Sequence, residues 1–381
     1  MKEFNSALSL PILLLALLVL FTGCAGLSEN PSPNPAPTSA AHGAFVFVSG
    51  FDGDTPRTNG FRLSPDGTLT PIPGSPFPIA GDLVVSGSFL IGRNGKDLAS
   101  YRIDPGSGRP VVVDSVAVPS PGVMAADAKN VYVNGTNSNL DSLFYGFSVG
   151  PSGALTPLPG APYTYAVGCG GNLDITCPMP ILGRLAVNDT FFAVAEIGFH
   201  DSGGLVIIPR QSSGVLQGGH KTGFSDQDRA ALTRPGGNIG FSSDSTSTEG
   251  LTSYLLDASG NPTRVTSFPI DSGITDAAVD PTGKFLLGVD GKGSVHVFAL
   301  DSATAAFSQI GASEPAGDSA DLMSIDPSGR FVIVGQSSNL ALSAPPDQIT
   351  VFTFDPASGA MKKLQSYPVS KLPLSIAIVA E

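Results

Sequence analysis

The chain has 381 residues, including 46 glycines and 33 prolines, and 41% of its residues are hydrophobic against 14% charged. This composition is typical of a globular all-β protein, in which many tight turns need a residue that tolerates positive φ. The 32 acidic residues outnumber the 20 basic ones, which gives a formal net charge of −12. No nucleic-acid partner is expected, because the sequence has no lysine or arginine cluster to neutralise phosphates.

The first 23 residues have the features of an export signal. Lys2 precedes an apolar run over residues 8–21, which is shorter than a membrane-spanning helix needs and suits a signal-peptide core. Residues 22–24, Thr-Gly-Cys, resemble the processing box of bacterial lipoproteins, in which the cysteine thiol is acylated and becomes the new N-terminus. We predict a signal peptide over residues 1–23 and lipidation of Cys24, with simple secretion or an uncleaved anchor as the alternatives.

A proline-rich segment follows the cysteine. Residues 28–41 contain four prolines at alternate positions and cannot build a core, so residues 24–43 are expected to form an extended tether. Ala25, rather than an aspartate, follows the cysteine. If the host is Gram-negative, this resembles outer-membrane sorting more than inner-membrane retention. The sequence therefore predicts an exported protein of the cell envelope, held in the membrane by its N-terminal lipid and facing the periplasm or displayed at the outer membrane.

Residues 44–381 repeat one pattern about seven times, with a period of about 40 to 60 residues. Each copy contains an aromatic strand, a glycine-containing turn and a second strand, and the clearest copies begin at Ala278 and Ser324. A period this long, built from short alternating strands between Gly, Pro and Asp turns, predicts a β-propeller. The Asp-Pro-x-Gly tetrads at Asp280 and Asp326 are turn signals, and we expect these aspartates to be structural.

Four types of strand can be traced through the repeats, which predicts seven four-stranded antiparallel blades. The first strands begin at Asp82, Gly122, Arg184, Ala230, Asp276, Leu322 and Leu374. This series starts after the first blade and ends at the C-terminus, so the ring must close by donation of its last strand. Residues 374–379 are expected to pair with residues 45–48, which removes an exposed sheet edge. We expect the propeller to be a monomer.

Cysteine usage agrees with export. Cys169 and Cys177 lie close together, and in an oxidising compartment we expect them to form a disulfide across a surface loop, with free thiols as the alternative. A zinc site needs more ligands than this segment supplies. Residues 52–54, Asp-Gly-Asp, lack the glutamate and the spacing of an EF-hand and are expected to form a hairpin turn. We predict no metal site and no cofactor.

Three phrases carry a family resemblance: Gly67-Thr-Leu-Thr-Pro-Ile-Pro-Gly-Ser-Pro-Phe77, Gly153-Ala-Leu-Thr-Pro-Leu-Pro-Gly-Ala-Pro162 and Val279-Asp-Pro-Thr-Gly-Lys-Phe285. They resemble the seven-bladed lactonase-like propellers, the group that contains 6-phosphogluconolactonases and carboxymuconate cyclases. The resemblance implies a site at the channel mouth, where a histidine-bearing first strand precedes a second strand ending in Asp-Leu-Gly. Here Glu196 takes the aspartate position, and no histidine occurs near Ile181.

The candidate site residues lie around this segment. Lactone opening needs a base that activates water and a cation or donor for the developing oxyanion. Glu196 or His200 with Arg184 are the candidate catalytic residues, and Asp201 and Arg234 are candidate ligand-binding residues. A polar ligand-binding rim and an ordinary surface loop are the alternatives for this group. His296 is expected to face outward from a strand.

Two functions follow from the sequence. The first is a lipid-anchored propeller that binds a small-molecule or protein ligand at the channel mouth, which accounts for the anchor, the tether and the missing histidine together. The second is a lactone hydrolase acting on an exported sugar or aromatic lactone, which accounts for the resemblance. We favour binding, because a fold alone does not determine an activity.

Overall fold

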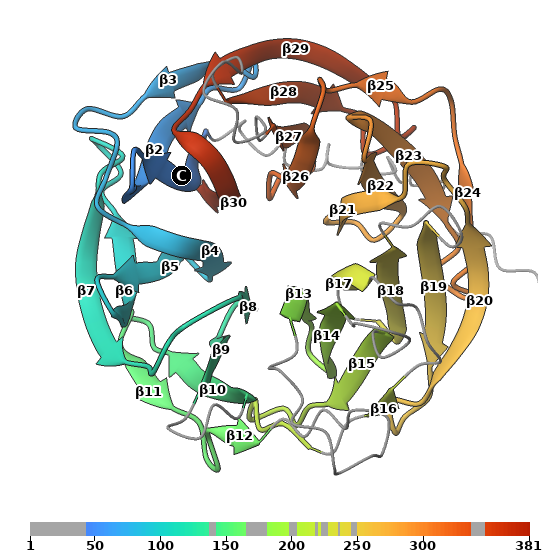
Figure 1. The fold of residues 1–381 in the computed structure, drawn as a ribbon, viewed down its shortest axis with the longest axis horizontal. Helices are drawn as coiled ribbons and strands as arrows, with labels where there is room; N and C mark the ends of the chain where they lie inside the picture. Colours follow the sequence, from blue (N-terminus) through green and yellow to red (C-terminus); the bar gives the residue numbers. More distant parts are fainter. Residues whose placement is uncertain are drawn as a thin grey trace, which may run out of the picture. The chain divides into compact units, whose positions relative to one another are not determined.

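The thirty strands of the described residues form seven blades set radially around a common centre, and a single parallel bridge joins two neighbouring blades into one eight-stranded sheet (Figure 1). The residues that the structure describes form strands and turns, and they include no helix long and apolar enough to cross a bilayer. The computed structural model describes residues 43–136, 142–164, 181–197, 204–217, 220–221, 228–234, 237–244, 250–336 and 347–381. The predicted seven-bladed propeller is therefore confirmed, and we number its blades along the chain.

The first four blades comprise the N-terminal half of the propeller together with the last strand. Blade 1 contains β30 (Lys371–Ala380), β1 (Ala44–Asp52), β2 (Thr55–Leu63) and β3 (Leu69–Pro71). Blade 2 contains β4 (Ala80–Ser86), β5 (Phe89–Asn94), β6 (Asp97–Ile103) and β7 (Pro110–Ala117). Blade 3 contains β8 (Met124–Ala126), β9 (Asn130–Thr136), β10 (Ser142–Val149), β11 (Leu155–Pro157) and β12 (Tyr163–Thr164). Blade 4 contains β13 (Ile181–Val187), β14 (Phe191–Ile197), β15 (Gly204–Pro209) and β16 (His220–Lys221).

The remaining three blades continue the ring in the same antiparallel order. Blade 5 contains β17 (Asp228–Thr233), β18 (Ile239–Asp244), β19 (Leu251–Leu256) and β20 (Pro262–Phe268). Blade 6 contains β21 (Ile274–Val279), β22 (Phe285–Asp290), β23 (Ser294–Leu300), β24 (Phe307–Gln309) and β25 (Glu314–Pro315). Blade 7 contains β26 (Ala320–Ile325), β27 (Phe331–Gln336), β28 (Gln348–Phe354) and β29 (Met361–Pro368). In every blade the first strand in this order faces the centre of the ring (Figure 1).

The hydrophobic core is divided among the contacts between neighbouring blades. Seven clusters of buried side chains occur, and each combines residues from two adjacent blades. In one of them Val46 and Ile378 of blade 1 pack with Ile333 and Val351 of blade 7. Since an apolar side chain contributes about 1.5–3 kcal/mol when fully buried, each blade is stabilised mainly by its two neighbours. An intact ring is therefore a condition for the stability of every blade.

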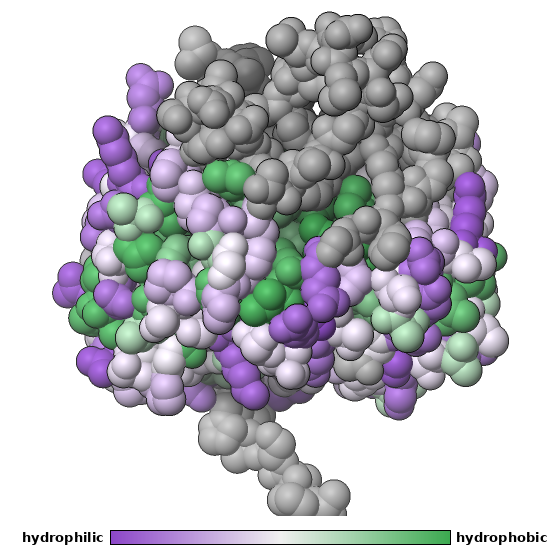
Figure 2. All heavy atoms as spheres, turned by 90° about the horizontal axis from the view of Figure 1, so that it is seen from below, coloured by the Kyte–Doolittle hydropathy of each residue, from purple (hydrophilic) through white to green (hydrophobic). Residues whose placement is uncertain are grey.

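The exterior of the ring carries a mixed surface. Figure 2 shows hydrophilic and hydrophobic residues interspersed over the described part of one side. Val111 and Val112 of the outer strand β7 are among the most exposed large apolar side chains. With Val113 they form a short exposed run, and apolar surface of this small extent is normal on soluble proteins, so these positions need no functional explanation.

The C-terminal strand closes the ring as the sequence predicts. β30 pairs antiparallel with β1, with Val379 opposite Phe45 and Ile376 opposite Val48. The hydroxyls of Ser49 and Ser375 lie 2.9 Å apart within this pair of strands. The first blade is thus built from both ends of the propeller, and no open seam remains between the first and last blades.

The Asp-Pro-x-Gly turns have the structural role predicted for them. Asp280 is fully buried, and its Oδ1 accepts hydrogen bonds from the backbone N–H groups of Lys284 at 2.8 Å and Phe285 at 2.6 Å. Asp326 repeats this arrangement with the N–H groups of the residues four and five positions later. Each aspartate therefore fixes the turn that leads into a second strand, and neither is available for chemistry.

Removal of β30 should destabilise the entire propeller. Deleting residues 371–381 takes away Ile376, Ile378 and Val379, each at most 5% exposed, and leaves the β1 edge unpaired. Three such side chains contribute roughly 5 kcal/mol or more, which is comparable to the whole stability of a typical domain. We expect circular dichroism to show loss of cooperative thermal unfolding in the truncated protein.

Deleting Glu381 alone is the matched control, because it removes a partly exposed ion pair with Arg62 and one terminal backbone hydrogen bond to Gly43 but no buried apolar side chain. This shorter deletion should lower stability by less than about 1 kcal/mol. An unchanged melting temperature in the longer truncation would contradict closure by β30.

Candidate functional site

A cavity of about 370 Å³ lies at the centre of the ring, between the inner strands. All seven inner strands contribute to its lining, namely β4, β8, β13, β17, β21, β26 and β30. Most of the lining side chains are apolar, among them Leu83, Val85 and Ile325, and Thr233 and Ser324 add hydroxyls. The charged residues that line it in the described part of the chain are Asp82 and Arg184.

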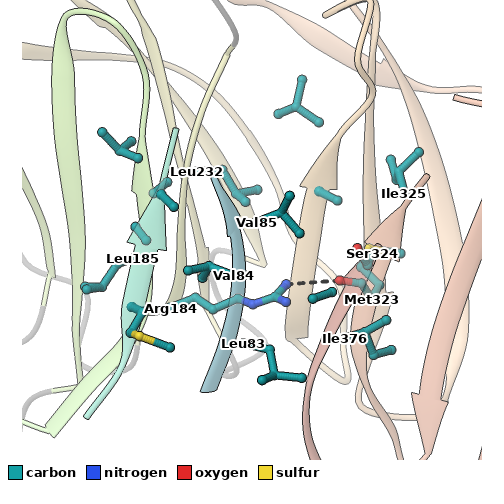
Figure 3. Close-up of a pocket in the computed structure, with 18 of the residues that line it drawn as sticks. Leu83, Val84, Val85, Arg184, Leu185, Leu232, Met323, Ser324, Ile325 and Ile376 are labelled. Atoms are coloured by element: carbon teal, nitrogen blue, oxygen red, sulfur yellow. Dashed lines mark hydrogen bonds between the residues drawn. The ribbon is translucent and has the colours of Figure 1, made fainter. Parts of the chain in front are cut away.

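Arg184 reaches from β13 across the cavity to the opposite side of the ring (Figure 3). Its Nη1 lies 2.7 Å from Oδ1 and 2.5 Å from Oδ2 of Asp276, which belongs to β21 in blade 6. The same nitrogen donates to the carbonyl oxygen of Met323 on β26 in blade 7, at 3.1 Å. The Arg184 side chain of blade 4 thus forms hydrogen bonds to both blade 6 and blade 7. The Arg184 side chain keeps 32% of its surface exposed, whereas Asp276 keeps 2%.

Asp82 and Asp276 join their own blade to the next one in the same way. Oδ2 of Asp82 accepts a hydrogen bond from the N–H of Met124 at 2.8 Å, and Oδ2 of Asp276 accepts one from the N–H of Met323 at 2.7 Å. The hydroxyl of Ser375 does the same for the N–H of Leu83 at 2.8 Å. In each case a polar residue of one inner strand accepts a hydrogen bond from a backbone N–H of the following inner strand.

Arg184 occupies the equivalent position in blade 4. Like the two aspartates and Ser375, it directly precedes a buried inner-strand residue, here Leu185. Its backbone also forms a parallel bridge to Ala230 of the next inner strand. The repeat therefore brings two carboxylates and one guanidinium to a single level of the central channel.

Burial and mutual attraction set the ionisation of this group. Burial raises the pKa of Asp82, while the N–H of Met124 and the charge of Arg184 act in the opposite direction. Burial likewise raises the pKa of Asp276, and its ion pair with Arg184 offsets part of that effect. Burial disfavours the charge of Arg184, but the attraction of Asp276 and Asp82 is stronger and raises its pKa above the usual value. The guanidinium therefore stays charged.

Sequence reasoning identified Arg184 but missed Asp82 and Asp276. Both aspartates were recognised as the first residues of inner strands, but no role was assigned to them. An alignment of the repeats could have indicated these two aspartates as site residues, because a charged residue at the same position of three otherwise apolar strands is unusual. Only the closed ring shows that these positions face each other.

Of the other predicted site residues, the structure describes the backbone of Glu196 and the side chain of Arg234. The backbone of Glu196 lies on β14 opposite Leu182, two residues before Arg184. His200 and Asp201 lie outside the described residues, as do Cys24, Cys169 and Cys177. Arg234 follows β17, and its Nε donates to the carbonyl oxygen of Gly283 at 3.2 Å, at a contact between blades 5 and 6. Arg234 is not among the described residues that line the cavity.

His296 differs from its predicted orientation. Its side chain is only 12% exposed, and its Nε2 lies 3.0 Å from Oδ2 of Asp290. The expectation that His296 faces outward is therefore wrong, because a carboxylate at the end of the neighbouring strand β22 holds the ring inside blade 6. Burial tends to raise the pKa of Asp290, but the hydrogen bonds from His296 and from backbone N–H groups prevail and lower it.

The fold and the site define a seven-bladed propeller with a charged crosslink in its central cavity. Residues 252–378 match the family described as "Lactonase, 7-bladed beta-propeller". The resemblance to lactonase-like propellers, which the sequence motifs indicated, is thereby confirmed. No curated protein shows a significant sequence match to the chain.

Solved structures of similar fold include several lactonase-like proteins. A putative 6-phosphogluconolactonase from Bacteroides uniformis superposes with a TM-score of 0.68 at 17% identity, covering 89% of this chain and 100% of its own. A putative 6-phosphogluconolactonase from Bacteroides fragilis gives 0.67 at 16% identity, with coverage of 90% and 100%. The periplasmic gluconolactonase of Pseudomonas aeruginosa gives 0.67 at 17% identity, with coverage of 89% and 99%. At such identities these likenesses establish the fold alone.

Proposed function

We propose that the protein binds a small molecule in the central cavity, beside Arg184. The observation that carries this proposal is a charged guanidinium inside a cavity of about 370 Å³ that is otherwise lined mainly by apolar side chains. That volume lies within the usual range for small-molecule sites, which combine apolar walls with a few oriented polar groups. Placing a partly buried arginine among apolar side chains costs free energy, and a ligand that uses its remaining donors would account for its retention.

We also propose that the protein is exported and anchored by a lipid on Cys24, with residues 24–43 as the tether. The short apolar run before Cys24 and the alternating prolines after it support this proposal. The likeness to a periplasmic gluconolactonase is consistent with a role outside the cytoplasm.

Hydrolysis of a lactone is the second candidate function. It is favoured by the family match and by a carboxylate of raised pKa, Asp82, lining the same cavity as Arg184. A carboxylate at this place would accept a proton from water as the resulting hydroxide adds to the lactone carbonyl. Arg184 would stabilise the oxyanion, and the ring oxygen would leave as a hydroxyl after taking up a proton. Glu196 is the alternative base that the family pattern favours.

Binding can be tested by thermal shift with a panel of lactones and their hydroxy acids. At least one compound should raise the melting temperature of the soluble domain, residues 25–381, and the Arg184→Ala variant should bind it at least about tenfold more weakly, because it loses a charged hydrogen-bond donor. Circular dichroism of the variant controls for folding. Equal affinities of wild type and variant, or no shift with any compound, would contradict the proposal.

Acid release from the same lactones separates binding from hydrolysis. If the wild-type protein releases acid, hydrolysis is established. If Asp82→Asn or Glu196→Gln then abolishes turnover but leaves ligand affinity unchanged, the substituted residue is the general base. Binding without acid release leaves the binding role as the function.

The anchor is tested independently by the Cys24→Ser substitution. Without a thiol to acylate, the protein should leave the membrane fraction after cell lysis, while the propeller keeps its melting temperature. Tight membrane association of the Cys24→Ser protein, measured by fractionation and immunoblotting, would refute the lipid anchor.

A further inference from the structure

The balance of charge around the cavity constrains what it can bind. One guanidinium, Arg184, faces two carboxylates, Asp82 and Asp276, and these are the charged groups at this level of the channel in the described residues. With both aspartates ionised the group carries a charge of −1, and with one of them protonated it is neutral. In neither state does it offer net positive charge to an anion.

Arg184 is also committed to its partners. A phosphate that paired with Nη1 would have to displace Asp276, whose side chain is 2% exposed and would be left as an uncompensated buried carboxylate. Breaking a buried ion pair in this way costs several kcal/mol. The ion pair with Asp276 therefore competes directly with any phosphorylated ligand.

A neutral ligand meets no such penalty. The described hydrogen bonds of the Arg184 side chain all involve Nη1, so Nε and Nη2 can donate to a carbonyl or hydroxyl oxygen without breaking the ion pair. The inner strands β4, β8, β21, β26 and β30 each end their sheet, and those backbone groups of their edges that are not bonded to another blade provide further donors and acceptors. The net charge of −12 on the whole chain adds a long-range repulsion for anions.

We infer that the cavity takes an uncharged small molecule with hydrogen-bonding oxygens and discriminates against its phosphorylated counterpart. This inference rests on the proposed binding function and specifies its ligand class. It also separates this chain from a role on sugar phosphates, which the names of two structural neighbours mention.

The test compares glucono-δ-lactone with its 6-phosphate, measured by thermal shift and by isothermal titration at low ionic strength. The neutral lactone should bind at least about tenfold more tightly than the phosphorylated one, because a dianion is repelled by the carboxylates. Tighter or equal binding of the phosphorylated lactone, with loss of that binding in Arg184→Ala, would overturn the inference and leave the proposed binding site intact. Binding of neither compound would overturn both.

Two charge variants test whether the charges around the cavity cause the preference for the neutral lactone. Asp82→Asn removes one negative charge, and Thr233→Lys adds a positive one at another position of the cavity lining. Each should reduce the preference for the neutral lactone by about tenfold. Two variants are used because one of them could misfold: they lie on different blades, and among the described residues Thr233 has no hydrogen bond to the next blade like that of Asp82 to Met124.

The matched control is Asp54→Asn, which makes the same charge change at an exposed residue of the β1–β2 turn. It should leave the preference unchanged. An equal effect of Asp54→Asn and Asp82→Asn would assign the discrimination to the net charge of the protein and contradict the role of the cavity.

Discussion

The contact of Arg184 with Asp276 and the Met323 carbonyl joins three blades across the middle of the ring. Neighbouring blades are joined around the circumference by shared hydrophobic clusters and by polar contacts such as that of Asp82 with the N–H of Met124. A link across the centre fixes the distance between opposite sides of the channel. It therefore decides which charges a ligand meets in the cavity.

The same repeat that builds the blades also builds this crosslink. A polar side chain of an inner strand accepts a hydrogen bond from a backbone N–H of the next inner strand, as Asp82, Asp276 and Ser375 do. At the equivalent position of blade 4 the chain has Arg184, whose long side chain turns to the opposite blades instead. An arginine at this one position of the repeat thus replaces a hydrogen bond between neighbouring blades with a charged group inside the cavity.

The fold could be predicted from the sequence in most of its features, and the site only in part. The turn chemistry at Asp280 and Asp326 and the order of strand types are local signals, and the missing first strand of the first blade implied closure by residues 374–379. Partnership across the ring leaves no local signal, since Arg184 and Asp276 are 92 positions apart. A charged residue at a strand start is normally read as solvated, so only the closed geometry shows that these carboxylates are buried. His296 was misjudged for a different reason: Asp290 is only six positions away, but the contact depends on how the adjacent strands β22 and β23 pair.

The strength of the crosslink is the quantity on which this account depends, and a double-mutant cycle measures it directly. Urea unfolding of Arg184→Met, Asp276→Asn and the double variant gives the coupling free energy between the two side chains. Because removing one partner leaves the other charge buried and removing both does not, we predict a coupling of about 2 kcal/mol, with the double variant no less stable than either single variant. Destabilisations that add within about 0.5 kcal/mol would contradict the account.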